Sequence, residues 1–382
     1  MADRRAVLIV GGGGAFGMRA AELLARIDHC DVFIGGRDVA RCEAAASAIA
    51  ARSMGTRPRL ITAVEIDATA VTAQALSTLG SPIVLNASGP YQGTQPALAR
   101  ACINAGCHYV DLADDRAFVT GIGALDAAAK ARGVLVVSGA STVPAISAAV
   151  IDHLRPRFSR LRSVTYGISP GNSFDPGLAT VQSILSTIGK PFETRINGRT
   201  ARVHGWQGLR RQQFGTLGMR WLASCDVPDL ALFPTRYPEI ATLQFGAGAE
   251  VALFHFGMWG VSWLARAGLV RNPVRLAGLL LAMKRWLRSL GSDAGGMAME
   301  FAGTGPDGQP LTIRWVLVAR SGHGPMIPAT PAVIVVRKLL DGRLAGTTGA
   351  RPCLDLVSLA DVEGELAEFD MTFNETNGDR PI

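Results

Sequence analysis

The first 150 residues alternate between short, nearly continuous apolar runs and longer alanine-rich stretches with helical spacing. The apolar runs lie at 6–10, 31–35, 59–66, 82–87, 108–113 and 134–138. Strands that are apolar on both faces are typical of a parallel sheet covered by helices on each side. Pro96 stands where a helix start is expected, and Gly106 and Gly133 where helices should end. The pattern therefore predicts a doubly wound, Rossmann-type α/β domain over residues 1–150.

The pattern changes after about residue 155. Alternating arms on either side of Asn197-Gly198 predict a hairpin over 192–203, and a similar pair predicts a longer hairpin over 297–320. Helical spacing occurs at 177–188, 249–267, 273–290 and 330–342. We therefore expect a second domain of α+β type, with an antiparallel or mixed sheet, over 151–345. A C-terminal segment, 346–382, is a candidate to pack back on the first domain, with a loose polar tail after about Asp370.

Composition narrows the class of protein. Of 382 residues, 48% are hydrophobic and 18% are charged, which favours large cores and argues against disorder. No apolar run reaches the roughly 18 residues of a membrane-spanning helix, and we expect no signal peptide and a cytoplasmic location. We expect a homodimer, and peripheral membrane contact stays open. The six cysteines are scattered without a CxxC pair, which favours buried thiols and no metal site.

The net charge of +7 comes from dispersed basic residues, of which only four are lysine. A nucleic-acid-binding protein usually concentrates its positive charge on one stripe. The dispersal therefore favours a small anionic ligand over nucleic acid, although a general preference for arginine explains it equally well.

A glycine cluster follows the first predicted strand. Gly12, Gly14 and Gly17 satisfy the pattern G-x-G-x-x-G between a strand and a helix. In a dinucleotide-binding turn the first glycine allows the tight turn, the second leaves room for the pyrophosphate, and the third lets helix and strand pack closely. The amides at the helix start, near Ala15 and Phe16, would then bind the phosphates.

The end of the second strand bears on which dinucleotide is bound. Arg37 stands there, and a guanidinium suits the 2′-phosphate of NADP(H); Asp38 keeps NAD(H) as the less favoured alternative. Asp67, after the third strand, is placed to meet the adenine edge or to cap a helix over 69–79. The loop after the fourth strand, with Ala87, Gly89, Pro90 and Tyr91, should pass the nicotinamide ribose.

With that loop, the sequence resembles a known family. "NASGPYQGTQPALARACINAGCHYVDLADD" followed by "GVLVVSGASTVPAISAAVIDHL" is similar to the NADP-binding half of saccharopine dehydrogenase-like (saccharopine reductase-like) oxidoreductases. The stretches 226–238 and 324–342 fit that family's second half more loosely. The resemblance implies a Rossmann domain, a substrate domain and hydride transfer with NADP(H), often at a C–N bond through an imine. The family also includes relatives that reduce C=C bonds on lipid or polyketide chains. Because its members share no single catalytic motif, the resemblance does not identify a catalytic residue.

The candidates for chemistry come from strand ends and from the second domain. Tyr91 is a candidate general acid or a wall against the nicotinamide, Asp111 a candidate to orient a substrate amine, and Tyr166 a polar group expected at a strand end. Arg211, in an arginine-rich segment, could clamp a substrate carboxylate, and His255 is a substrate candidate or a core histidine.

The sequence thus predicts an NADP(H)-dependent oxidoreductase that acts on an amino-acid-like imine, a small-molecule substrate. Two alternatives stay open. One is a trans-acting enoyl reductase on an apolar acyl chain, for which the aromatic stretch 254–286 would be a pocket, a core or a membrane-facing surface. The other is a non-catalytic NADP-binding sensor or scaffold.

Overall fold

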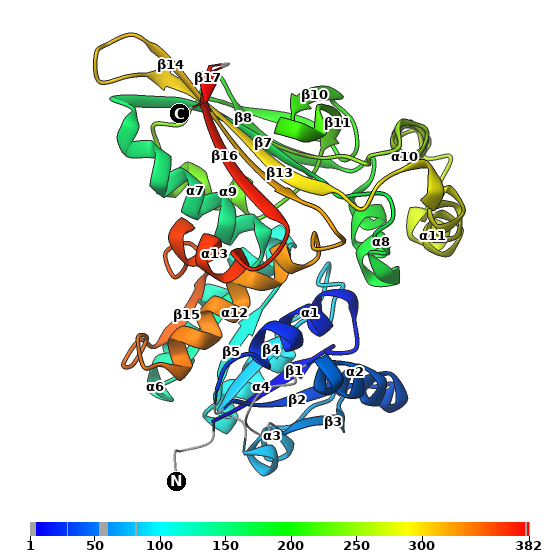
Figure 1. The fold of residues 1–382 in the computed structure, drawn as a ribbon, viewed down its shortest axis with the longest axis vertical. Coiled ribbons are helices and arrows are strands. Elements are labelled where there is room, and N and C mark those ends of the chain that lie inside the picture. The colour runs from blue at the N-terminus through cyan, green and yellow to red at the C-terminus, as the bar shows by residue number, and fades with distance from the viewer. Residues whose placement is uncertain (1–4, 29, 53–59, 81, 379, 382) are drawn as a thin grey trace. The chain divides into compact units, whose positions relative to one another are not determined.

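A computed structural model describes residues 5–28, 30–52, 60–80, 82–378 and 380–381. The chain divides into two compact units (Figure 1). Unit 1 comprises Met1–Ala149 and Pro325–Glu365, and unit 2 comprises Val150–Gly324 and Leu366–Ile382. The division differs from the sequence-based boundaries, because residues 325–345 lie in unit 1 and not in the second domain.

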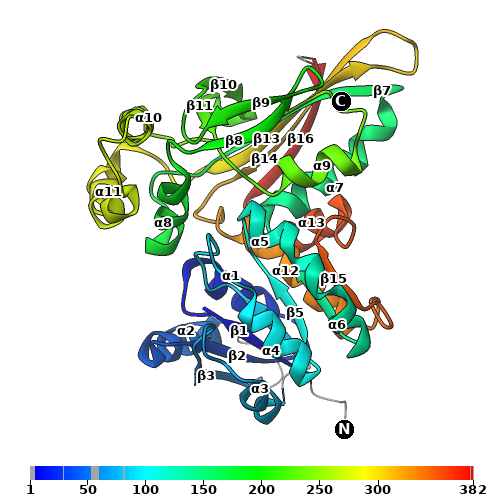
Figure 2. The same ribbon diagram turned by 180° about the vertical axis from the view of Figure 1, so that it is seen from behind.

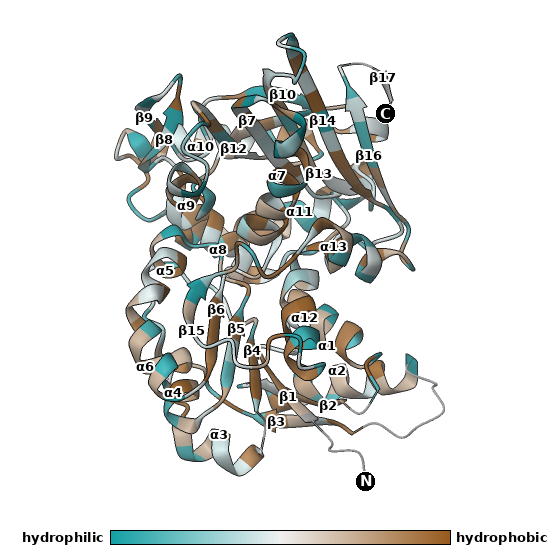
Figure 3. Cartoon of the chain, turned by 90° about the vertical axis from the view of Figure 1, so that its left-hand side faces the viewer, coloured by the Kyte–Doolittle hydropathy of each residue, from teal (hydrophilic) through white to brown (hydrophobic). Residues whose placement is uncertain are grey.

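Unit 1 is built on seven parallel strands in the order β15-β6-β5-β4-β1-β2-β3. The strands are β1 (Arg5–Val10), β2 (Cys30–Gly36), β3 (Ile61–Glu65), β4 (Ile83–Asn86), β5 (His108–Asp111), β6 (Leu135–Ser138) and β15 (Gly349–Pro352). All residues of β4 and β6 are buried, as their apolar sequences predict, and both are brown in Figure 3. The predicted Rossmann-type sheet is confirmed; residue 59 of its third predicted strand lies outside the described residues.

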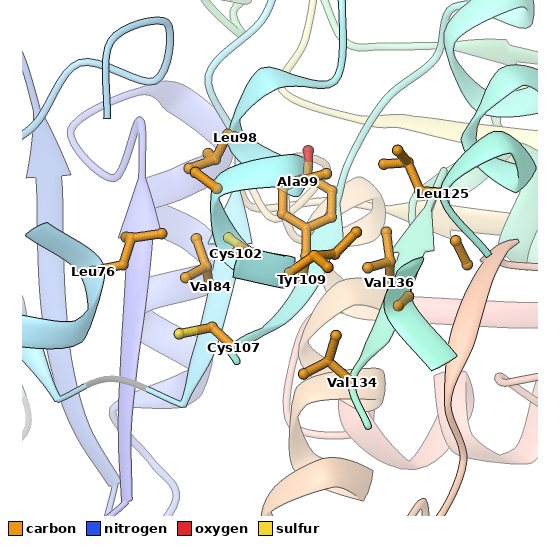
Figure 4. Close-up of a cluster of buried hydrophobic side chains, with 14 of the residues drawn as sticks. Leu76, Val84, Leu98, Ala99, Cys102, Cys107, Tyr109, Leu125, Val134 and Val136 are labelled. Carbon is orange, nitrogen blue, oxygen red and sulfur yellow. The ribbon is translucent and has the colours of Figure 1, made fainter. Parts of the chain in front are cut away.

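Helices connect these strands and cover the sheet. They are α1 (Ala15–Leu24), α2 (Val39–Arg52), α3 (Ala73–Leu79), α4 (Ala97–Ala105), α5 (Arg116–Gly121), α6 (Asp126–Ala131) and α12 (Met326–Leu340). Helix α13 (Leu359–Leu366) follows β15, and α7 (Ser147–Leu154) begins in unit 1 and continues into unit 2. One core of unit 1 lies between the sheet and α3, α4 and α6 (Figure 4). In it the ring of Tyr109 lies among Ala99, Val136 and other apolar side chains, with its hydroxyl directed to one side.

Helix α12 accounts for most of the difference in the domain boundaries. Its residues are buried almost all round, and it packs beside α1. A helix that is apolar on every side needs partners on every side, and its sequence does not indicate which sheet provides them. Strand β15 follows α12 and adds to the edge of β6, so the chain returns to unit 1 after most of unit 2.

Unit 2 contains a mixed sheet in the order β10-β11-β12-β7-β13-β14-β16-β17, with the hairpin β8–β9 attached to β12. Its strands are β7 (Arg160–Ser169), β8 (Pro191–Ile196), β9 (Arg199–His204), β10 (Arg210–Gln213), β11 (Met219–Ser224), β12 (Thr242–Ala247), β13 (Gly295–Thr304), β14 (Pro310–Ala319), β16 (Met371–Asn377) and β17 (Arg380–Pro381). Both predicted hairpins are present, as β8–β9 and β13–β14. The expectation of a loose tail after Asp370 is wrong, because β16 pairs with β14 along its whole length.

The helices of unit 2 are α8 (Gly177–Thr187), α9 (Asp229–Arg236), α10 (Ala252–Arg266) and α11 (Ala277–Trp286). Short helical turns over 273–276 and 287–290 flank α11, so the predicted helix over 273–290 is three pieces. Helices α8, α10 and α11 share one apolar core. The three helices are seen from two sides in Figures 1 and 2. Among the described residues, no helix has the length and apolar character needed to cross a membrane.

Candidate functional site

The candidate site lies at the carboxyl ends of β1 and β4, which are neighbours in the sheet of unit 1. Val10 pairs with Asn86, and the amide of Ala87 donates a hydrogen bond of 2.8 Å to the carbonyl of Val10. The strand order reverses at this pair, since β2 follows on one side and β5 on the other. Open α/β sheets bind ligands at such a switch point. The pairing brings together the glycine loop after β1 and the loop after β4.

The glycine loop leaves almost no room for side chains. An ideal Cβ on Gly17 would lie 2.3 Å from the carbonyl oxygen of Gly11, and one on Gly12 would lie 2.7 Å from Ile34 Cγ2. Gly11, which precedes the three glycines of the motif, has a φ of +80° and so takes the left-handed conformation in this turn. Its Cβ would meet the backbone of Ala87 at 2.8 Å. The loop therefore needs glycine for close packing of backbone on backbone.

The start of α1 suits an anion. Gly14 is the N-cap in an extended conformation, with no side-chain hydrogen bond to the helix, and the first turn holds no acidic residue. The first amides of a helix have no acceptor within the helix, and the helix dipole favours negative charge there. Ala15 and Phe16 begin this turn, as expected from the sequence. The absence of a Cβ on Gly14 keeps the approach to these amides open.

Two arginines stand at the end of β2. Arg37 is exposed directly after the strand. Arg41, on the first turn of α2, donates from Nε to the carbonyl oxygen of Gly13 at 2.7 Å, which holds its side chain against the glycine loop. Asp38 accepts a 3.0 Å hydrogen bond from the amide of Arg41 and so caps α2. The sequence analysis missed Arg41; its place four residues after Arg37, one helical turn on, was the available signal.

Asp67 is engaged within its own loop. Its Oδ1 accepts hydrogen bonds from the amide and the hydroxyl of Thr69, at 2.9 and 2.7 Å, and these hold the pKa of Asp67 below its usual value. The expected cap of a helix over 69–79 is wrong, because α3 begins at Ala73 and the hydroxyl of Thr72 caps it. An adenine contact of Asp67 stays a prediction.

The loop after β4 is held by side chains on two strands. Asn86 is buried; its amide nitrogen donates to the hydroxyl of Tyr109 at 3.0 Å, and its Oδ1 accepts from the amide of Ser88 at 3.0 Å. Tyr91 is buried as well, and its hydroxyl donates to the carbonyl oxygen of Asn86 at 2.8 Å. The ring of Tyr91 packs on Phe118, with 5.1 Å between the centroids. These bonds fix the course of the loop from Ala87 through Gly89 and Pro90.

Because of its surroundings, Tyr91 is better suited to be a wall than an acid. Burial, and then the charges of Asp111 and Asp114, raise the pKa of its hydroxyl well above the ordinary value. Its proton is also committed to a backbone carbonyl. Of the two roles that the sequence left open, the packing role therefore fits the geometry.

Tyr91→Phe is expected to cost stability and to leave nucleotide binding intact. The change removes one of the two hydrogen bonds to the buried Asn86 carbonyl, which keeps the bond from the amide of Leu112, at a cost of about 0.5–1.5 kcal/mol in the free energy of unfolding. Urea unfolding and a titration with NADPH measure the two effects. Unchanged stability together with a loss of turnover above about 100-fold would instead assign the acid role to Tyr91.

Asp111 ends β5 and is fully buried. Its Oδ1 accepts from the amides of Ala113 and Gly139, at 3.0 and 2.8 Å, and from the hydroxyl of Ser138 at 3.0 Å. Its Oδ2 has no hydrogen-bond partner among the described residues. Burial raises the pKa of Asp111 to about 6, against the opposing effect of these hydrogen bonds. The carboxyl group thus joins the ends of β5 and β6 through one of its two oxygens.

The remaining candidates lie in unit 2. Tyr166 lies inside β7 rather than at its end, and its buried hydroxyl donates to Asp229 at 2.7 Å. Arg211 is exposed, with its guanidinium over the ring of Trp221. Its neighbour Arg210 points inward and donates to the carbonyl of Tyr166 at 2.6 Å, and burial lowers the pKa of Arg210 to about 10. Arg210 is thus the more enclosed cation of the two.

His255 lies on the inner side of α10 and is fully buried. Its Nδ1 accepts a 3.3 Å hydrogen bond from the amide of Ala249, and its ring packs on Trp206 with 5.6 Å between the centroids. Burial lowers the pKa of His255 to about 4, so the ring is neutral. Of the two roles that the sequence left open for His255, this environment is typical of a core histidine and not of a residue that contacts substrate.

Comparison with known proteins agrees with the geometry of unit 1. Residues 7–137, which run from β1 to β6, match the model of the saccharopine dehydrogenase NADP-binding domain. Over these residues the chain is similar to the saccharopine dehydrogenase NADP-binding domain. The glycine loop, the two arginines and the loop after β4 all lie within the matched residues.

Two individual proteins resemble the chain over different extents. A carboxyaminopropylagmatine dehydrogenase from Synechocystis sp. is 34% identical over 110 residues, which are 28% of this chain and 25% of that protein. The match thus spans about a quarter of that relative. The structure of apo saccharopine dehydrogenase (L-Glu forming) from Saccharomyces cerevisiae aligns with a TM-score of 0.67 and 16% identity. It covers 98% of this chain and 99% of its own, so the two chains share their fold.

Proposed function

We propose that the chain is an NADP(H)-dependent oxidoreductase that transfers hydride to or from the C=N bond of an amino-acid-like imine. The cofactor assignment rests on Arg41, which is held against the glycine loop, and on Arg37, which is exposed directly after β2, while the Asp38 carboxylate is turned to the start of α2. When bound, NADP(H) supplies or accepts the hydride at nicotinamide C4. An acidic residue facing the ribose would favour NAD(H) instead.

Different residues of unit 1 would bind different parts of the dinucleotide. Gly12, Gly14 and Gly17 let the backbone approach the pyrophosphate, whose charge the first amides of α1 offset. The two arginines would hold the 2′-phosphate by charge-assisted hydrogen bonds. The loop from Ala87 to Tyr91 would form the wall beside the nicotinamide ribose.

The proposed substrate class rests on the two relatives and on three polar side chains. Both relatives named above are dehydrogenases, and the family resembled by the sequence often acts on C–N bonds. Asp111 is our candidate to bind the substrate nitrogen, since its pKa near 6 lets it take or give a proton close to neutral pH. Arg210 and Arg211 are the candidates to bind a substrate carboxylate.

Arg37→Ala and Arg41→Ala are each expected to weaken NADPH binding about 10- to 100-fold and NADH binding less than about 3-fold. A charge-assisted hydrogen bond contributes about 1.5–3 kcal/mol, and only NADPH carries the 2′-phosphate. Parallel fluorescence titrations with NADPH and NADH measure both. Arg100→Ala, an exposed arginine on α4, is the matched control. Equal weakening of both nucleotides would overturn the assignment.

Hydride transfer needs its own test. NADPH carrying deuterium at C4 is incubated with the protein and pairs of α-keto acids and amines, and mass spectrometry detects deuterated amine. Deuterium transfer to enoyl substrates alone would show that the substrate is an enoyl group on an acyl chain and not an imine. Tight NADPH binding with no transfer to either class would make the chain a sensor or scaffold.

A further inference from the structure

Helices α10 and α11 of unit 2 present large apolar side chains to the outside. Leu253, Phe256, Trp263 and Leu264 are exposed on α10, and their spacing places them within about 100° of the helix circumference. On α11 and the turn after it, Leu279, Met283, Trp286 and Leu290 form a similar stripe, in which Trp286 is 84% exposed. We call these eight side chains and the segment that carries them, 252–290, the α10–α11 face.

The fold of unit 2 does not use this face. The inner sides of the two helices already pack, through residues such as Met258 and Leu281, into the core shared with α8. Figures 1 and 2 show α10 and α11 at the same edge of unit 2. Helices that are apolar on both sides are stable in water only with a second partner, and exposed apolar patches of this kind mark interaction sites.

The charges within the segment that carries the face are all of one sign. Residues 251–291 contain six arginines and lysines and no aspartate or glutamate. Arg266, Lys284 and Arg285 have protein partners, among them Gln207 and Asp175. By contrast, Arg271, Arg275 and Arg288 are exposed, and within the described part of the chain their side chains make no hydrogen bond or ion pair.

Carboxylates from other elements do not neutralise these three arginines. Asp175, before α8, pairs with Arg285 at 2.8 Å. Glu250, just before α10, pairs with Arg220 and accepts from the backbone and hydroxyl of Ser292. The face therefore combines exposed leucine, methionine and tryptophan with unneutralised arginine.

We propose that the α10–α11 face docks on the surface of a membrane that contains anionic lipids. Tryptophan and leucine of an interfacial helix enter the boundary between headgroups and acyl chains, while arginines bind lipid phosphates. A second copy of the chain fits the face less well. A two-fold contact would bring the arginines of both copies together without carboxylates between them. The proposal does not depend on the chemistry at the nucleotide site.

The test is flotation of the full-length protein with vesicles. Phosphatidylcholine vesicles are compared with vesicles in which a quarter of the lipid is phosphatidylglycerol. We expect binding to the anionic vesicles, weakened in 0.5 M salt. Arg271→Gln, Arg275→Gln and Arg288→Gln combined should lower the partition coefficient at least about 10-fold, because each arginine near an anionic surface contributes to binding. Leu279→Ser with Trp286→Ser should lower it by at least as much.

The control is Leu60→Ser, which removes an exposed apolar side chain of unit 1 and should leave vesicle binding unchanged. Circular dichroism on heating shows that each variant is folded. Equal binding to neutral and anionic vesicles, or binding that survives both sets of substitutions, would overturn the proposal. Absence of vesicle binding, with light scattering that shows a dimer converted to a monomer by Leu279→Ser and Trp286→Ser, would make the face a contact between copies.

Discussion

Gly17→Ala is expected to weaken binding of NADPH at least about 100-fold, a loss of roughly 2.7 kcal/mol. The new Cβ would stand 2.3 Å from the carbonyl oxygen of Gly11 and 2.8 Å from the Cα of Gly12. Both are backbone atoms, so the start of α1 and the glycine loop must move apart. That movement shifts the amides of the first turn away from the pyrophosphate. Fluorescence titration with NADPH measures the loss.

The matched control for this prediction is Gly121→Ala. Gly121 lies in α5 of the same unit, and a Cβ added there would meet no atom within 4 Å. We expect unchanged NADPH binding and equal or slightly higher stability, because alanine favours helix. A Gly17→Ala protein that is folded and binds NADPH as well as the unsubstituted chain would show that the glycine loop is architecture only.

Asp111→Asn is expected to change the pH dependence of stability. The pKa of Asp111 is about 6 in the folded protein, against a reference value of 3.8. Between these values the folded state binds more protons than the unfolded state, so this carboxyl group lowers stability as the pH rises from about 4 to about 6. The shift of about two units corresponds to about 3 kcal/mol. Asparagine does not ionise. Between pH 4 and pH 7 the free energy of unfolding of the variant should therefore rise by about 3 kcal/mol relative to that of the unsubstituted chain.

Urea unfolding at several pH values between 4 and 8 measures this difference. Asp67→Asn is the control of opposite sign, because hydrogen bonds from Thr69 lower the pKa of exposed Asp67. Removal of the Asp67 carboxylate should lower the free energy of unfolding at pH values above the pKa of this group in the unfolded chain. The loss should vanish as the pH falls through the pKa of Asp67 in the folded protein. Parallel pH profiles for the unsubstituted chain and Asp111→Asn would contradict the assignment of a shifted carboxyl to Asp111.

The sheet of unit 1 and both hairpins could be predicted because their signals are local. A strand such as β6 is apolar on both faces, and the turn Asn197-Gly198 needs left-handed residues, with φ of 50° and 76°. The neighbours of α12 and β16 are set by contacts distant in sequence. The apolar sequence of α12 fits any buried site, and the polar sequence of β16 gives no sign of the edge of β14 that it pairs with.

The candidate site was predictable to a similar degree. The three glycines and Arg37 follow from motif and strand position. Arg41 and Asn86 were missed because their roles depend on which backbone carbonyl or hydroxyl lies within reach after folding. The cap of α5 shows the same limit, because Asp115, and not its neighbour Asp114, accepts from the amide of Phe118. Neighbouring aspartates cannot be told apart until the backbone is in place.

The late return of the chain to unit 1 has a consequence for its biosynthesis. Helix α12 and strand β15 leave the ribosome only after the whole stretch from Val150 to Gly324. Until then the nascent unit 1 lacks the helix that packs beside α1, and β6, which pairs with β5 on one side, has an open outer edge. Domains usually fold in order of synthesis, N-terminal first. Here the nucleotide-binding unit, although it begins the chain, can complete its sheet only after most of unit 2 has been translated.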